Sequence, residues 1–176
     1  MTRVLAAAIG LVMAVLIGVM GVAVGGSLFV SQQCGAISAP GASGGALAEG
    51  LTAAQIAYGN VIVEVGVREG VPVRAAVIAV ATALQESGLR NVPPGQGDLD
   101  SVGLFQQRPS QGWGTAKQLA DPQYAAAAFY RALVRVHGWQ SLPLTVAAQS
   151  VQKSALPGAY ARWEPLATVL VEQALG

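Results

Sequence analysis

The chain contains 176 residues, of which 53% are hydrophobic and 11% are charged, and its formal net charge is +1. It has no basic block and no interleaving of basic and aromatic residues, so nucleic acid is not an expected partner. Cys34 is the only cysteine and His137 the only histidine, which excludes an internal disulfide framework and gives no support for a metal centre, and no cofactor is expected.

Residues 4–30 form an apolar run without a charged side chain. About 20 such residues suffice to cross a bilayer as a helix. A secretory signal peptide has a shorter apolar region, of about 7–15 residues, and ends at a small-residue cleavage site that is not evident here. We therefore expect residues 1–31 to be an uncleaved membrane anchor, with a cleaved signal peptide and a secreted protein as the alternative. Arg3 on the N-terminal flank places the N-terminus in the cytoplasm and the rest of the chain outside.

Residues 32–50 are small, Gly-rich and almost uncharged, which is typical of a flexible linker. The remaining residues, 51–176, are enough for one compact domain with a single core. The expected organisation is thus an anchor, a linker and one extracytoplasmic domain.

Two helices are predicted at the start of this domain. Thr52 and Gln55 form a capping-box pattern that opens a helix over residues 53–69. Pro72 fits the first turn of a second helix over residues 72–89. This second helix is apolar nearly all round, so we expect it to be the buried centre of the domain.

The rest of the domain is predicted to be a long loop followed by three helices. Residues 90–114 are rich in Gly, Pro and Asp and show no sustained period, which indicates a loop with at most a short strand pair or turn. Two later helices open with a capping residue followed by proline, at Asp121-Pro122 and at Ser141 with Pro143. The expected helices span residues 122–138, 144–155 and 160–175. The predicted fold class is mainly α.

Glu86 is the single charged residue of the apolar segment AVIAVATALQESGL. At about 100° per residue it falls on the helix face of Ala75, Ala79 and Thr82, where small side chains leave room. Partial burial and the negative end of the helix dipole would both raise the pKa of its carboxyl group, as a general acid for glycosidic cleavage requires. From this helix alone, an exposed residue paired with Arg90 at i, i+4 is the favoured interpretation.

Two downstream segments reverse that preference. The Glu86-Ser87 pair is followed by GLFQQRP at residues 103–109 and by LADPQYAAAAFYRAL at residues 119–133. In this order the chain resembles the lysozyme-like soluble lytic transglycosylases, in which a helix ends in a catalytic Glu-Ser, a loop carries Gly-Leu-x-Gln-x-x-Pro, and a later helix opens with Asp-Pro and carries an aromatic pair. Gln107 departs from the aliphatic residue that is usual in that loop. The resemblance covers roughly residues 72–165, and its matching positions are Gly103, Leu104, Gln106, Pro109, Asp121, Pro122 and Tyr130.

The resemblance implies cleavage of the β-1,4 bond between N-acetylmuramic acid and N-acetylglucosamine in peptidoglycan. Glu86 would act as general acid and then as base, leaving a 1,6-anhydro sugar. Hydrolysis by a muramidase is the alternative and normally uses a second carboxylate. Animal lysozymes with a similar loop carry an aspartate at the position of Ser101. Asp98 and Asp100 lie nearby and keep hydrolysis open, although a role as turn formers is favoured for both.

Four positions are expected to contact the glycan: Ser101, Gln106, Gln149 and Tyr160. Tyr160 resembles the tyrosine that follows the family's later motif, and it is expected to approach Glu86. For Gln106, stabilisation of its own loop is an open alternative to sugar binding. The family's later Ala-Tyr-Asn-Ala-Gly segment is altered here, with Gln149 in place of the tyrosine and Ser150 in place of the asparagine.

Three tryptophans, Trp113, Trp139 and Trp163, could stack on sugar faces, although packing within the fold is the favoured role. The expected partners are peptidoglycan glycan strands and, through residues 4–30, the bacterial cell membrane, with a secretion or conjugation apparatus as a further candidate. A non-catalytic wall-binding or scaffold module is the competing interpretation, because of the altered Gln149-Ser150 segment.

Overall fold

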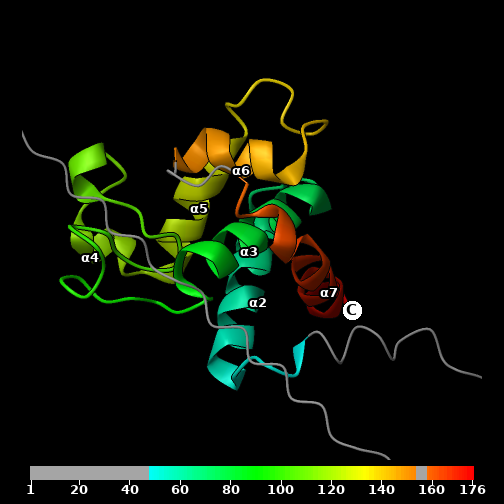
Figure 1. The fold of residues 1–176 in the computed structure, drawn as a ribbon, viewed down its shortest axis with the longest axis horizontal. Helices are drawn as coiled ribbons and strands as arrows, with labels where there is room; N and C mark the ends of the chain where they lie inside the picture. The colour runs from blue at the N-terminus through cyan, green and yellow to red at the C-terminus, as the bar shows by residue number, and fades with distance from the viewer. Residues whose placement is uncertain (1–47, 154–157) are drawn as a thin grey trace, which may run out of the picture. The chain divides into compact units, whose positions relative to one another are not determined.

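The computed structural model describes residues 48–153 and 158–176. The expected anchor at residues 4–30 and nearly all of the linker lie outside these ranges. The described part is mainly helical and contains no β-strand, which confirms the predicted mainly-α class (Figure 1). Within the same ranges, none of the helices combines the length and the hydropathy needed to cross a bilayer.

The first described long helix, α2 (Ala53–Arg68), begins with the predicted capping box. The Thr52 backbone N–H donates to Oε1 of Gln55 at 2.9 Å, and the Gln55 N–H donates to the Thr52 hydroxyl at 3.3 Å. Both donors would otherwise be unsatisfied at a helix start. Nε2 of Gln55 also donates to the carbonyl of Gly88 at 2.7 Å, so the start of α2 is joined to the end of the next helix.

Helix α3 (Val73–Ser87) is the centre of the domain (Figure 1). Every residue from Ala75 to Leu84 is buried, as the nearly continuous apolar pattern predicted. Pro72 stands just before the helix as its N-cap, and Gly88 ends the helix in the left-handed region at φ 63°, which glycine adopts without steric cost. The helices in contact with α3 are α2, α5 (Pro122–Leu133), α6 (Leu144–Gln152) and α7 (Glu164–Leu175).

Helices α2 and α5 pack closely because Gly66 has no side chain. A Cβ atom at Gly66 would lie 2.9 Å from the hydroxyl oxygen of Tyr130. That hydroxyl donates to the carbonyl of Ile62 at 2.9 Å, and burial raises the pKa of Tyr130 above its ordinary value. Tyr130, which matches the aromatic pair of the family motif, therefore serves the helix packing.

Helix α5 begins as predicted but is shorter than expected. The Asp121 carboxylate accepts the backbone N–H of Gln123 at 2.9 Å, and the helix ends at Leu133 instead of residue 138. The following backbone forms i to i+3 turns, including a bond from the Val136 N–H to the Leu133 carbonyl. These turns bring Trp139 into the core, where it is buried.

The last two helices also differ from their predicted bounds. Ser141 does not cap α6, because Pro143 stands at the N-cap without a side-chain hydrogen bond, and Lys153 in the left-handed region at φ 52° ends that helix at Gln152. The final segment is not one α-helix from residue 160. A 3-10 turn, η2 (Ala161–Trp163), precedes α7 because a proline occupies the first turn of α7, where its missing N–H is tolerated.

Candidate active site

Glu86 lies in the last turn of α3, directly after the buried run that ends at Leu84. Its side chain is partly buried, and this loss of hydration is the largest influence on its pKa, which is raised above the usual value of 4.5. The carboxyl group therefore keeps its proton, which it can donate, to a higher pH than an ordinary glutamate does.

Tyr160 is the partner of this carboxyl group. Its hydroxyl donates to Oε1 of Glu86 at 2.6 Å, across a separation of 74 residues, and its ring is fully buried. The predicted approach of Tyr160 to Glu86 is therefore confirmed. The side chain of Gln152 is a second hydrogen-bonding neighbour, and both groups lower the pKa of Glu86, but by less than burial raises it.

The alternative interpretation of Glu86, as an exposed residue paired with Arg90, is wrong. Among the described residues the ion pairs are Arg74 with Glu164 and Arg108 with Asp100, and neither involves Glu86. Packing of the end of α3 on the apolar core and the hydrogen bond from the Tyr160 hydroxyl together keep the Glu86 carboxyl group partly buried.

The two residues beside Glu86 fix the end of α3 to other segments. Oε1 of Gln85 accepts the indole N–H of Trp163 at 2.9 Å and a guanidinium N–H of Arg162 at 3.0 Å. The hydroxyl of Ser87 donates to the carbonyl of Leu104 at 2.8 Å. Gln85 thus holds the segment that carries Tyr160, and Ser87 holds the downstream loop, so these contacts keep Glu86 in one position.

The loop that carries the GLFQQRP motif folds back on itself. Val102 and Gln107 exchange backbone hydrogen bonds as an isolated antiparallel bridge, and Gly103 between them has a left-handed φ of 77°. The buried side chain of Gln107 donates to the carbonyl of Ala125 at 3.2 Å. Gln107, a departure from the family pattern, therefore ties the loop to α5. The ring of Phe105 stacks on Phe129 of α5 at a centroid distance of 4.8 Å.

Gln106 and Ser101 stabilise this loop. Nε2 of Gln106 donates to the carbonyl of Gly103 at 2.9 Å, and its Oε1 lies against Gly97. The carbonyl of Ser101 also lies so close to Gly97 that a Cβ atom there would clash with it. Ser101 is buried. Neither side chain hydrogen-bonds Glu86 in the part of the chain that the structure describes.

The two nearby aspartates form turns. One oxygen of Asp100 accepts the Nε–H of Arg108 at 2.6 Å, and the other accepts the backbone N–H of Ser110 at 2.8 Å. Hydrogen bonding from Arg108, followed by that from Ser110, holds the pKa of Asp100 well below its usual range. Asp98 is exposed, and its carbonyl accepts the N–H of Ser101.

Gln152 is a site residue that the sequence analysis missed. It lies on α6 three residues after Gln149, so the two glutamines share one helix face. Nε2 of Gln152 donates to the carbonyl of Phe105 at 2.8 Å, and the same side chain contacts Glu86. Gln149 itself is half-buried, and the hydroxyl of Ser150 bonds back to the carbonyl of Val146 within α6. In the sequence, the repeat of glutamine at positions 149 and 152 was the signal that could have indicated Gln152 as a site residue.

A cavity of about 370 Å³ adjoins Gln152, whose side chain also hydrogen-bonds Glu86. It is lined by Gln111, Trp113, Val151, Gln152 and Lys153. Trp113 is the tryptophan at this cavity, whereas Trp139 lies in the core and Trp163 holds Gln85. The walls combine amide groups, one cation and one aromatic face, which together suit a polar ligand with an apolar side such as a sugar.

Across residues 48–153 and 158–176, no three His, Cys, Asp or Glu side chains gather closely enough to hold a metal ion. His137 is exposed in the turns that follow α5. No protein-family model matches the chain, and no curated protein matches it either.

Proposed function

We propose that this protein is a lytic transglycosylase with a lysozyme-like helical domain, which cleaves the β-1,4 bond between N-acetylmuramic acid and N-acetylglucosamine in peptidoglycan. The observation that carries the proposal is the 2.6 Å hydrogen bond from Tyr160 to the partly buried Glu86 at the end of α3. The raised pKa of Glu86 supports the role of general acid. The motif order of residues 86–130 supplies the substrate class.

In the proposed reaction, Glu86 donates its proton to the glycosidic oxygen as the bond from that oxygen to the anomeric carbon breaks. The resulting carboxylate then accepts the proton of the muramyl C6 hydroxyl while the C6 oxygen bonds to the anomeric carbon. The product carries a 1,6-anhydro ring, and Glu86 returns to its protonated form. Tyr160 can stabilise the intermediate carboxylate by the hydrogen bond that it already donates.

The surroundings of Asp100 favour this reaction over hydrolysis. A hydrolase normally has a second carboxylate that acts as nucleophile or that activates water. Asp100 already accepts hydrogen bonds from Arg108 and Ser110, and Ser101 cannot supply a carboxylate. With Glu86 serving as both acid and base, the proposed reaction uses the C6 hydroxyl of the sugar as nucleophile, where a hydrolase uses water.

The location that we propose is the outer face of a bacterial cytoplasmic membrane, with residues 1–31 as the anchor. Such a protein would act on nearby glycan strands, and local gaps in the wall would suit a secretion or conjugation apparatus.

The test is digestion of purified peptidoglycan sacculi by the full chain and by its Glu86→Gln variant, followed by mass spectrometry of the soluble fragments. We expect anhydro ends from the wild type and, since general acids contribute about 10²–10⁴-fold, at least a hundredfold slower release by the variant. Reducing ends would establish a muramidase instead. Binding to sacculi without any release would establish a wall-binding module and refute the proposal.

A further inference from the structure

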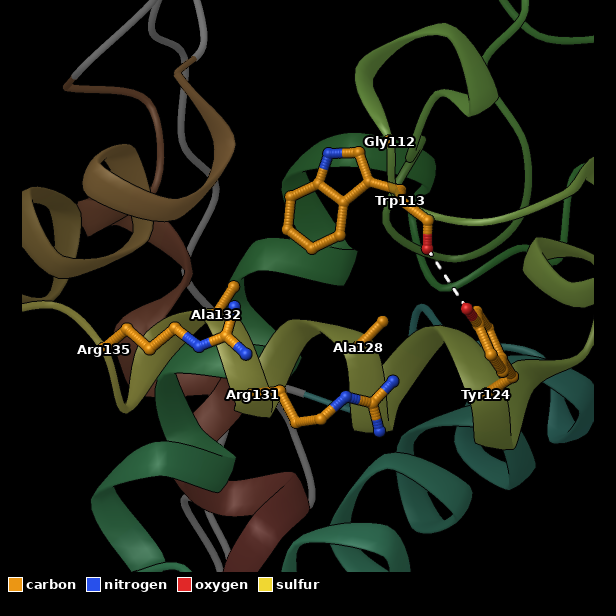
Figure 2. Close-up of a pocket in the computed structure, with 7 residues that line it drawn as sticks. All are labelled: Gly112, Trp113, Tyr124, Ala128, Arg131, Ala132 and Arg135. Carbon is orange, nitrogen blue, oxygen red and sulfur yellow. Dashed lines mark hydrogen bonds between the residues drawn. The ribbon is translucent and has the colours of Figure 1, made fainter.

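A second cavity, of about 250 Å³, lies on the side of α5 that faces the loop after η1 (Pro109–Gln111), and no step of the proposed reaction uses it (Figure 2). Figure 2 shows the indole ring of Trp113 across from α5. We call this cavity the arginine pocket. It is lined by Gly112, Trp113, Tyr124, Ala128, Arg131, Ala132 and Arg135.

The α5 side of the arginine pocket follows from helical spacing. Tyr124, Ala128, Arg131 and Ala132 recur at intervals that place them on one face, and Arg135 continues that face in the turn after the helix. The two alanines leave space that larger side chains would fill. The pocket therefore has a floor of short side chains, and each of its two alanines is followed three residues later by an arginine.

The opposite wall is held in place by Tyr124. Its hydroxyl donates to the Trp113 carbonyl at 3.3 Å. A Cβ atom at Gly114 would lie 2.7 Å from that hydroxyl oxygen, and Gly114 has a φ of 143°, which favours glycine. The contact of Tyr124 with Trp113 and Gly114 thus holds the backbone that carries the indole ring.

In residues 48–153 and 158–176, no acidic side chain forms an ion pair with the two positive charges of the arginine pocket. None of its lining residues is acidic, and both ion pairs of the described residues lie elsewhere, at Arg74 and Arg108. Arg131 and Arg135 are exposed at the mouth. Arg131 lies 5.8 Å from the centroid of the Tyr124 ring, within the range of a cation–π contact, which leaves its N–H groups free to bind an anion.

Trp113 is a wall of more than one cavity. It lines both the arginine pocket and the cavity that contains Gln152, and Gln152 contacts Glu86. The two cavities therefore share the Trp113 wall, and one of them shares Gln152 with the surroundings of Glu86.

We propose that the arginine pocket binds a carboxylate of the peptide stems of peptidoglycan, and so selects glycan strands that carry peptides. Planar guanidinium groups match a carboxylate through paired N–H donors, and the Trp113 face can cover the aliphatic part of the same peptide. The inference rests on the proposed function, because peptide stems are the carboxylate-bearing groups that a glycan at Glu86 brings with it.

The experiment measures binding instead of cleavage, so its result can be interpreted even if Glu86 is not catalytic. The full chain with Glu86→Gln is titrated in mild detergent with soluble peptidoglycan strands that carry their peptides, and with the same strands after enzymatic removal of the peptides. We expect tighter binding of the peptide-bearing strands by about tenfold, a typical effect of well-formed charged hydrogen bonds.

The decisive variant adds Arg131→Gln and Arg135→Gln, which should bring the two affinities to equality. A matched control, Arg68→Gln with Lys117→Gln, removes the same charge from outside the pocket and should keep the preference. Arg131→Lys with Arg135→Lys keeps the charge but not the paired N–H donors, so this variant should retain only part of the preference for peptide-bearing strands. Thermal unfolding of each variant establishes that it is folded.

Two results would overturn the proposal. One is a preference for peptide-bearing strands that survives in the glutamine variant or disappears equally in the control. The other is competition by short polyglycerol phosphate as effective as that by the free peptide stem, because this would assign the pocket to phosphate. Absence of cleavage by the wild type would refute the proposed reaction and leave this binding result intact.

Discussion

Glu86 at the end of α3 and Asp100 in the loop before η1 are two carboxyl groups with opposite surroundings. Burial raises the pKa of Glu86, and the hydrogen bond that it accepts from Tyr160 offsets only part of that rise. Asp100 is bonded to the guanidinium of Arg108 and to Ser110, so that its pKa is lowered. Groups with separated pKa values can take different roles. Glu86 keeps its proton to a higher pH than an ordinary glutamate, whereas Asp100 stays ionised to a lower pH than an ordinary aspartate and closes a loop.

The largest expected effect separates these roles directly. Glu86→Gln should slow the release of soluble muropeptides at least a hundredfold because the proton donor is lost. Asp100→Asn should slow it no more than about threefold, since that residue acts through the loop and surface pairs contribute little. Initial rates on purified sacculi measure both. An equal loss in the two variants would make Asp100 a second catalytic carboxylate and would favour the muramidase reaction.

The next effect tests the hydrogen bond to Glu86. Tyr160→Phe should reduce the rate about tenfold, since the ionised form of Glu86 loses a charge-assisted hydrogen bond. The Tyr160 hydroxyl favours the ionised carboxylate and lowers its pKa. Its removal raises that pKa further, so the alkaline limb of the pH–rate profile should move to higher pH.

The control for this variant is Tyr58→Phe, which removes a hydroxyl from a half-buried tyrosine of α2. It should leave both the rate and the profile unchanged. If the alkaline limb of the pH–rate profile lies at the same pH in Tyr160→Phe as in the wild type, the hydrogen bond from Tyr160 does not affect the pKa of Glu86.

The helices were largely predictable because their signals are local. The capping box of Thr52 and Gln55 and the Asp121-Pro122 pair each depend on residues within one turn, and both begin helices as expected. The helix ends were less predictable. The end of α6 depends on the left-handed backbone of Lys153, which nothing in its residue type requires.

The contacts of the site were less predictable because they join distant segments. Periodicity placed Glu86 on a helix face, but its burial depends on packing, and its bond to Tyr160 crosses 74 residues. Only the resemblance to a known motif order suggested that contact. Gln152 was missed because its role depends on how α6 meets the loop at Phe105. The bond between Asp100 and Arg108 likewise depends on the path of the loop.

The stability of the loop region should depend on pH through Asp100. A lowered pKa means that the ionised form stabilises the fold above the ordinary value of 3.8, and that this contribution is lost as pH falls below it. Asp100→Asn should lower the melting temperature by about 2 °C at neutral pH, an effect typical of an exposed ion pair. The difference from wild type should shrink in acid. Thermal unfolding of both proteins from neutral pH to pH 3 measures this difference in melting temperature. A difference that stays constant over that range would contradict a stabilising role of the ion pair between Asp100 and Arg108.

The smallest effect should have the opposite pH dependence, at Glu86. Because its pKa is raised in the fold, the native state binds more protons than the unfolded state as pH rises above the ordinary value of 4.5, and stability falls until the raised pKa is passed. Glu86→Gln keeps an oxygen to accept the Tyr160 hydroxyl but has no charge to bury. The variant should therefore melt slightly higher than wild type at neutral pH and equal it near pH 4. If the wild type is instead the more stable protein at neutral pH, burial of the Glu86 carboxylate does not oppose folding. The raised pKa of Glu86 would then have no physical basis.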